Sequence, residues 1–221
     1  MIAINKLKTN LLFDNLTDNE IKIIISCAKS ESYQKNETIF FEKDYVSKMY
    51  LVISGGVAIS KYDIDGNKSI VAHINEYDMF AESIALANPN ISPYTVEAIT
   101  NTQVLALDLE TFKKLTKDIP SLLDNMVMIL ATKNTYLTFK IDCLSKHTIR
   151  ERVYEILRYY YIKENSNTIK LPYNRSQLAE FLCLNRSSLT RELTKMEAEG
   201  LFTYKKGVYK LNIEKLFLKC D

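Results

Sequence analysis

The stretch from Asn174 to Glu199 constrains the fold of this 221-residue chain more than any other part. Two apolar patterns with helical spacing lie in it, and each follows an asparagine, a residue that caps helices well. Asn174 stands before the first pattern, which comprises Leu178, Ala179, Phe181 and Leu182. Asn185 stands before the second, which comprises Leu189, Leu193 and Met196. The stretch therefore predicts two helices with a tight break at Cys183-Leu184-Asn185.

The polar residues of the second helix indicate nucleic-acid recognition. Its first turns carry hydrogen-bonding groups with little bulk: Arg186, Ser187, Ser188, Thr190 and Arg191. A helix that enters the DNA major groove presents base-reading groups near its N-terminus in this way. Gly200 is expected to end the helix, and residues 201–211 predict a small hairpin, or wing, that turns at Lys205-Lys206-Gly207. We interpret the segment as a winged helix-turn-helix; the alternative is a helical hairpin that only packs.

Basic residues are concentrated in the C-terminal part of the chain. Residues 146–221 hold 15 Lys and Arg against 9 Asp and Glu, whereas residues 1–145 hold 14 against 18. All six arginines lie in the C-terminal part, at positions 150, 152, 158, 175, 186 and 191. A positive domain beside a negative one is typical of a nucleic-acid module attached to something else. Three of the arginines, Arg150, Arg152 and Arg158, share a predicted helix with Glu151 and Glu155 and are expected to form helix ion pairs.

Composition argues against several other classes of protein. No apolar run approaches the ~20 residues of a membrane span, and the opening apolar residues 2–4 are too few for a signal peptide. Cysteines 27, 143, 183 and 220 are scattered without a CxxC pair, which predicts neither a zinc site nor a disulfide framework. The chain also lacks a nucleotide-binding glycine loop and any distinctive pairing of acidic residues. We therefore expect a cytoplasmic protein that is not an enzyme.

The N-terminal half predicts helices followed by strands. Residues 1–30 are expected to be helical, with Thr17 and Glu20 in capping-box positions. Short β-rich runs then recur at residues 38–41, 49–53, 57–62, 69–74, 96–100 and 103–107. Turn residues such as Asp65-Gly66 separate them, which favours an antiparallel sandwich or roll. A short helix over residues 109–116 is expected to close this domain.

A long helix is predicted from about Pro120 to Leu144. Its apolar residues alternate spacings of four and three: Leu123, Val127, Leu130, Asn134, Leu137, Ile141 and Leu144. With Val127, Asn134 and Ile141 at the a positions of a heptad, leucine occupies every d position, a pattern that favours a two-stranded coiled coil. We interpret this seam, residues 123–144, as a dimerisation surface; the alternative is that it packs only on its own β domain. After a break at residues 145–148, a further helix is expected from Ile149 to Glu164.

The order of these elements resembles that of the Crp/Fnr family of bacterial transcription regulators, over the whole chain. Local matches are residues 50–55 (YLVISG), Asp65-Gly66, residues 79–82 (MFAE) with 95–98 (TVEA), and residues 174–200. The resemblance implies an α+β protein with three parts: a β-roll effector domain (1–118), a central dimerisation helix (119–145) and a winged helix-turn-helix domain (146–221). It also implies a homodimer that binds a near-palindromic DNA operator and RNA polymerase.

By the same resemblance, Arg191 would read a guanine, Ser187 would be a second base-reading residue and Arg186 a third candidate. Asn185 and Ser188 would contact phosphates. The whole candidate DNA interface comprises Asn174, Asn185, Arg186, Ser187, Ser188, Thr190, Arg191, Lys205 and Lys206.

An effector bound between the β-roll and the long helix would shift the angle of the two DNA domains. Family positions give these candidate pocket residues: Glu82, Ser83, Ser92, Tyr94, Lys133, Leu137 and Thr138.

The chain departs from the known effector sites of the family. The cyclic-nucleotide branch uses a Gly-Glu pair and an Arg-Ser pair, where this chain has Ala81-Glu82 and Ser92-Pro93. A cyclic phosphate without its arginine would be an unneutralised buried charge, so cyclic AMP is disfavoured. The scattered cysteines disfavour an iron–sulfur cluster. His73 lies in a predicted strand and His147 at a predicted helix start; His73 as a haem ligand is one interpretation, and a packed or exposed histidine is the favoured one.

Several glycines that are common in the family are replaced here. Lys43, Tyr77 and Ala81 stand at turns of the β-roll, and Cys183 stands in the turn of the helix-turn-helix. If Cys183 has a positive φ, that conformation costs ~1 kcal/mol; a redox role for its thiol is an alternative. The function that follows is effector-gated regulation of transcription. The rival interpretations are a constitutive DNA-binding regulator with a vestigial pocket, and a ligand-gated enzyme.

Overall fold

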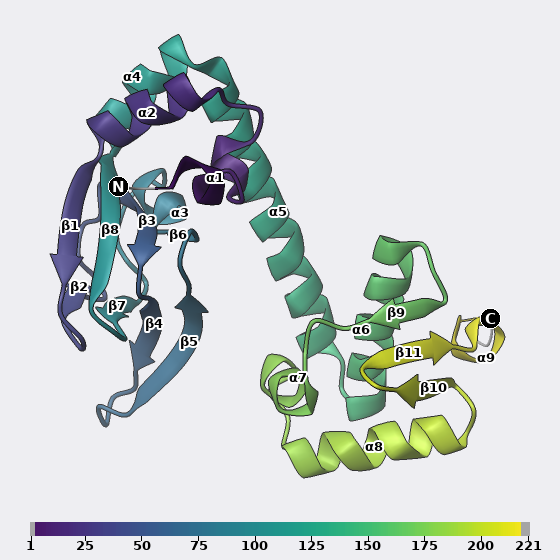
Figure 1. The fold of residues 1–221 in the computed structure, drawn as a ribbon. Helices are drawn as coiled ribbons and strands as arrows, with labels where there is room; N and C mark the ends of the chain where they lie inside the picture. Colours follow the sequence, from purple (N-terminus) through teal and green to yellow (C-terminus); the bar gives the residue numbers. More distant parts are fainter. Residues whose placement is uncertain (1–2, 218–221) are drawn as a thin grey trace. The chain divides into compact units, whose positions relative to one another are not determined.

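The computed structural model describes residues 3–217. These residues fall into two compact units, with the division between Ala131 and Thr132. The first unit contains an antiparallel roll with helices packed on it, and the second contains helices and a small sheet (Figure 1). This is the α+β architecture that the sequence predicts. Within the described residues, no helix is both long and apolar enough to cross a membrane.

The first unit begins with the predicted helical region, which is short and interrupted. It comprises α1 (Ile4–Leu7), a 3-10 turn (Leu11–Phe13) and α2 (Asp18–Cys27). Thr17 and Glu20 form the expected capping box: the Thr17 amide donates to Glu20 Oε2 at 2.8 Å, and the Glu20 amide donates to Thr17 Oγ1 at 3.3 Å. Ile21 and Ile24 of α2 are buried against the roll.

Two four-stranded antiparallel sheets form the roll. One has the order β1 (Lys29–Tyr33), β8 (Thr102–Asp108), β3 (Lys48–Ser54), β6 (Met79–Phe80). The other has the order β2 (Thr38–Phe40), β7 (Thr95–Ala98), β4 (Val57–Tyr62), β5 (Lys68–Ile74). Alternate residues of β3 face opposite sides, as the pleat requires: Val52 packs inside the roll, whereas Leu51 packs against the helices.

The prediction that residues 1–30 are helical is wrong at its end, because β1 begins at Lys29. Its sequence, KSESY, has no alternation of apolar and polar residues. The strand forms at the edge of its sheet, where all five residues pair with β8 from Lys29–Ala106 to Tyr33–Thr102. A partner distant in sequence therefore determines this strand. The two-residue strand β6 and the four-residue helix α3 (Glu82–Ala85) also carry too little pattern to be predicted.

After α4 (Leu109–Asp118), the long helix α5 runs from Pro120 to Ser145, as predicted. One face of α5 packs on the first unit through Leu122, Met126 and Ile129, all of which are buried. The seam lies on a different face: Leu123, Val127, Leu137 and Ile141 are between 47% and 65% exposed. Packing on the chain's own β domain therefore uses mainly residues beside the seam, together with the half-buried Leu130 of the seam, and leaves most of the seam uncovered.

The second unit is built on three helices and a three-stranded sheet. The helices are α6 (Ile149–Glu164), α7 (Arg175–Phe181) and α8 (Arg186–Ala198), followed by the short α9 (Ile213–Phe217). The predicted hairpin, β10 (Phe202–Lys205) and β11 (Val208–Leu211), gains a third strand, β9 (Thr168–Lys170), which pairs with β11. Phe139 and Cys143 of α5 belong to the core of this unit, so α5 contributes residues to both units.

The four residues that replace family glycines keep a glycine-like backbone. Lys43, Tyr77, Ala81 and Cys183 have φ values of 74°, 67°, 65° and 52°. The turns have therefore kept the left-handed conformation although their side chains have become bulkier. At Cys183 the conformation is imposed by the break between α7 and α8, where the Leu184 amide donates back to the Ala179 carbonyl at 2.8 Å.

We expect Cys183→Gly to stabilise the second unit by about 1 kcal/mol, because only glycine adopts a positive φ without steric cost. For a domain of this size that gain corresponds to a rise in Tm of about 4–8 °C. Thermal unfolding followed by circular dichroism measures it. Cys183→Ser is the matched control, since it removes the thiol and keeps the strained side chain. Equal Tm values for the glycine and serine variants would contradict the strain at this position.

Candidate nucleic-acid interface

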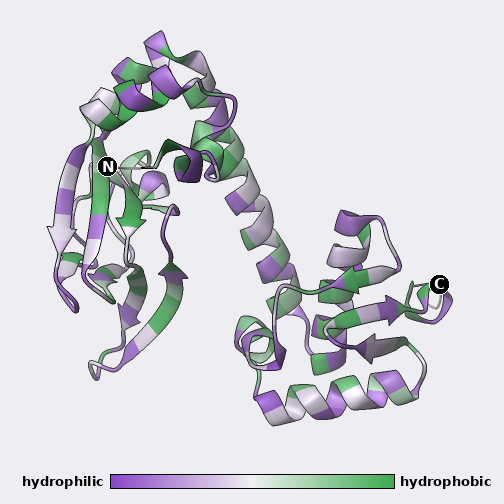
Figure 2. Cartoon of the chain, in the orientation of Figure 1, coloured by the Kyte–Doolittle hydropathy of each residue, from purple (hydrophilic) through white to green (hydrophobic). Residues whose placement is uncertain are grey.

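The helix α8 separates apolar and polar residues onto opposite faces. Leu189, Leu193 and Met196 are buried in the core of the second unit. Arg186, Ser187, Thr190 and Arg191 are exposed, and Ser188 is half-buried. Hydrophilic and hydrophobic residues accordingly alternate along α8 (Figure 2). The alternative of a helical hairpin that only packs does not account for two exposed arginines within the first six residues of the helix.

The two asparagines cap their helices as the sequence predicts. Asn174 Oδ1 accepts from the Ser176 and Gln177 amides at 2.9 and 3.0 Å, and Asn185 Oδ1 accepts from the Ser187 amide at 2.9 Å. A cap uses the oxygen of the side-chain amide, so the NH₂ group of Asn185 is not used by the cap and can donate to another group. The helix-turn-helix therefore begins each helix with a side chain that both fixes the backbone and retains a donor.

Two hydroxyl groups on the exposed face already donate within the helix. Ser187 Oγ donates to Asn185 Oδ1 at 2.8 Å, and Thr190 Oγ1 donates to the Arg186 carbonyl at 2.8 Å. The remaining lone pairs of these hydroxyls can accept, so Ser187 and Thr190 suit the amino groups of bases. On this face the guanidinium groups of Arg186 and Arg191 are donors only, whereas these two hydroxyls can accept.

The wing is fixed to the rest of the unit by Arg175 and Glu197, two residues that the sequence reasoning did not select. The Arg175 guanidinium carbon lies 4.6 Å from the centre of the Tyr204 ring, and Glu197 Oε1 accepts from the Tyr204 amide at 2.7 Å. Lys205 and Lys206 at the tip of the wing are exposed. No sequence pattern joins Arg175 to Tyr204, because they meet only through the fold.

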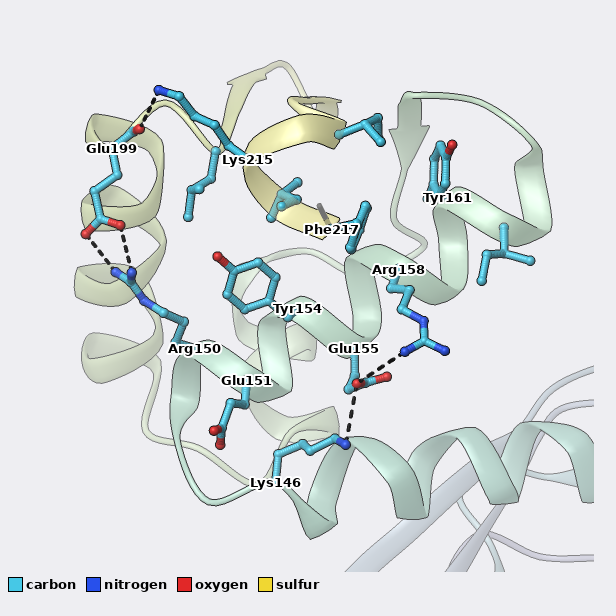
Figure 3. A pocket seen from close by; sticks show the side chains of 14 residues that line it. Lys146, Arg150, Glu151, Tyr154, Glu155, Arg158, Tyr161, Glu199, Lys215 and Phe217 are labelled. Atoms are coloured by element: carbon cyan, nitrogen blue, oxygen red, sulfur yellow. Dashed lines mark hydrogen bonds and ion pairs between the residues drawn. The ribbon is translucent and has the colours of Figure 1, made fainter. Parts of the chain in front are cut away.

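Two of the three arginines of α6 have different partners from those predicted. Arg150 forms ion pairs with Glu192 of α8 and with Glu199, the residue that follows α8, and not with Glu151 or Glu155. Figure 3 shows the pair with Glu199. Arg152 donates to the carbonyls of Lys146 and Leu182, at 3.0 and 2.9 Å. Only Arg158 pairs within the helix, at 3.9 Å from Glu155.

The correction has a physical reason. The prediction relied on the presence of Glu151 and Glu155 in the same helix as the arginines. The carboxylates of α8 are nearer to Arg150, and the Leu182 carbonyl at the end of α7 is nearer to Arg152. Both pairings depend on the way in which α6, α7 and α8 pack together.

The candidate pocket residues are divided between the two units. In the first unit Glu82 and Ser92 are buried, Tyr94 is half-buried and Ser83 is exposed. Ser92 Oγ donates to the Tyr94 carbonyl at 2.6 Å. Burial, with a smaller contribution from the nearby Glu82 carboxylate, raises the pKa of Tyr94 to about 12. Lys133, Leu137 and Thr138 are exposed residues of the second unit. The pocket as a whole stays a prediction.

The cysteines and histidines of the described part of the chain are separate from one another. Cys27 and Cys183 are exposed and free, whereas Cys143 is buried, and burial raises the pKa of its thiol to about 12. Cys220 lies outside the described residues. His73 and His147 are exposed. Among residues 3–217, no three His, Cys, Asp or Glu side chains gather as a metal site.

Comparison with known proteins agrees with this architecture. A cyclic nucleotide-binding domain model matches residues 30–118, and a Crp-like helix-turn-helix domain model matches residues 151–217. The cyclic AMP receptor protein of Thermus thermophilus is 25% identical over 196 residues, which is 88% of this chain and 89% of that protein. The nitrogen fixation regulation protein FixK of Bradyrhizobium diazoefficiens is 23% identical over 199 residues, covering 88% and 82%.

A similar fold occurs in the crystal structure of the Thermus thermophilus catabolite activator protein, with a TM-score of 0.58 and 22% identity over 93% of this chain and 95% of that one. A β-roll joined to a winged helix-turn-helix with an exposed polar helix defines a DNA-binding transcription regulator. This chain belongs to the Crp/Fnr family of such regulators. The relatives are transcription regulators and not enzymes.

Proposed function

We propose that this chain acts as a homodimer that binds a near-palindromic DNA site in the cytoplasm and contacts RNA polymerase there. The recognition helices, α8 of each protomer, would enter major grooves about one helical turn apart. The observation that carries the proposal is the exposure of Arg186 and Arg191 on α8 while the opposite face is held in the core. Arginine is suited to the O6 and N7 atoms of guanine.

The dimer would form along the seam of α5. Val127 and Ile141 are β-branched residues at a positions, Leu137 is at a d position, and all three are more than half exposed in the single chain. Exposed apolar residues that recur at heptad spacing indicate a surface that another helix covers. Asn134 at the central a position is exposed as well, and a buried asparagine pair would fix the register of two parallel helices.

The remaining residues of the interface would hold the protein on the backbone of the duplex. Asn174, Asn185 and Ser188 would donate to phosphates, and Lys205 and Lys206 of the wing would contribute charge. Ser187 and Thr190 would accept from base amino groups in the major groove. This division assigns sequence discrimination to the first turns of α8, and orientation on the duplex to its flanks.

The effector would be a small molecule, or a gas or redox signal, other than cyclic AMP. The interior of the roll near Glu82 is aromatic: Tyr50 stacks on Phe80 at 4.9 Å between ring centres, and Phe40 lies 6.5 Å from Tyr94. No arginine occurs in the first 149 residues to neutralise a phosphate in that interior. The same tight aromatic packing favours the second candidate, a constitutive regulator whose pocket is vestigial.

Two measurements test the proposal. Selection of duplexes from a random pool should yield one motif with two inverted half-sites about 10 base pairs apart; the absence of any enriched motif would refute specific recognition. Native mass spectrometry with an absorbance spectrum of the purified protein identifies a retained effector. DNA affinity that no cell extract changes would favour the constitutive regulator over the gated one.

A further inference from the structure

The Arg150 guanidinium donates three hydrogen bonds to two carboxylates, one in the recognition helix α8 and one directly after it. Its Nε donates to Glu192 Oε1 at 2.6 Å, and its Nη1 and Nη2 donate to the two carboxylate oxygens of Glu199 at 2.7 and 2.8 Å. Figure 3 shows the paired bonds to Glu199 and, on the other side of that residue, Lys215 donating to its carbonyl. The contact raises the pKa of Arg150 and lowers that of Glu199. Arg150 and Glu199 are therefore charged at neutral pH.

The contact joins the start of α6 to one side of α8. Glu192 and Glu199 are seven residues apart, about two helical turns, so they project from that side. Arg186 and Arg191 project in other directions, about 120° and about 100° around the helix from Glu192. Arg150 is the second residue of α6, directly after the Thr148 cap and the break that ends α5. Arg150 therefore links the segment that follows α5 to the recognition helix α8.

The contact adds a directional constraint to the apolar core. Ile156 and Leu157 of α6 pack in the same cluster as Leu193 and Met196 of α8, so the core already sets the spacing of the helices and limits the rotation of α8. A planar guanidinium that binds two carboxylates two turns apart has a fixed geometry. It therefore resists the small rotations of α8 that the core still allows.

We propose that Arg150 is a positioning residue for DNA recognition, which sets the angle at which Arg186 and Arg191 meet the bases. The inference rests on the proposed DNA-binding function. It assigns no DNA contact to Arg150. Its consequence is that the ratio of specific to non-specific affinity depends on two carboxylates that would themselves repel DNA.

The test compares Arg150→Gln and Glu199→Gln in the full chain. The probes are a duplex selected from a random pool by the wild-type protein and a scrambled duplex of the same length, at one salt concentration. We expect Arg150→Gln to lower the specific-to-non-specific ratio about tenfold, as the loss of one well-placed base contact would. Arg158→Gln removes the same charge from the same helix and should leave the ratio unchanged, since Arg158 makes only a long pair with Glu155.

Glu199→Gln separates positioning from simple charge. Removal of a negative charge strengthens binding to any duplex if charge alone matters. Positioning predicts a lower ratio instead, whereas Glu180→Gln, the same change on α7, should not lower it. A Glu199→Gln protein that binds both duplexes more tightly with an unchanged ratio would overturn the inference, even if Arg150→Gln failed to fold. If the wild-type protein selects no duplex, the proposed DNA-binding function is refuted, and this inference is refuted with it.

Discussion

Replacement of Arg191 by alanine is expected to weaken binding to the selected duplex roughly 5- to 150-fold, because a bidentate contact to a base edge contributes about 1–3 kcal/mol. The side chain is exposed on α8, opposite the buried Leu189 and Leu193. The variant should also tolerate any base at one position of each half-site. Fluorescence anisotropy with duplexes that differ at single positions measures both effects at constant salt.

Arg158→Ala is the matched control for that variant. It removes the same side chain from α6, where Arg158 is exposed and lies away from the recognition helix. A small, uniform loss on every duplex is expected for it. If Arg191→Ala also weakened all duplexes equally and kept every base preference, Arg191 would be a phosphate contact and not a base-reading residue.

Val127→Glu is expected to raise the dissociation constant of the proposed dimer about 100-fold or more. In that dimer the substitution would place two carboxylates opposite each other, and like charges juxtaposed at an interface cost several kcal/mol. The side chain is 59% exposed in the single chain, so the substitution should not disturb the fold of the protomer. Sedimentation of the variant should show single chains. Its affinity for the two-half-site duplex should fall with the loss of the dimer.

The neighbouring Met128 provides a closely matched control. It is apolar, 57% exposed and on the same helix, but it lies at a b position, outside the seam. Met128→Glu should sediment as the wild type does. Dimers that survive Val127→Glu, or dissociate equally with Met128→Glu, would show that the protomers associate elsewhere.

Features that depend on near neighbours in the chain were predictable. Thr17, Asn174 and Asn185 cap the helices expected of them, and the long helix ends within one residue of its predicted end. These features need only a polar side chain three residues from an amide, or apolar residues at 3.6-residue spacing. The exposed face of α8 follows for the same reason, since its buried and exposed residues are fixed by one helical period.

Features that depend on distant partners were not predictable. β1 is a strand because β8 lies beside it, and β9 because β11 does. Arg150 was expected to pair along its own helix, yet its partners are 42 and 49 residues away. Several partners of suitable charge exist in the sequence for each such group, and local spacing does not choose among them.

The sequence by itself determined the two kinds of domain, the helix-turn-helix with its exposed arginines, and the seam of the long helix. Each of these follows from periodicity, capping residues and charge, which act over a few residues. Only the tertiary structure decided which face of α5 is covered, that Cys183 has a positive φ, and that Arg150 binds Glu192 and Glu199. Those outcomes depend on which surfaces meet when the elements within each unit pack, and the energy of a contact is gained only once the chain has brought its partners together.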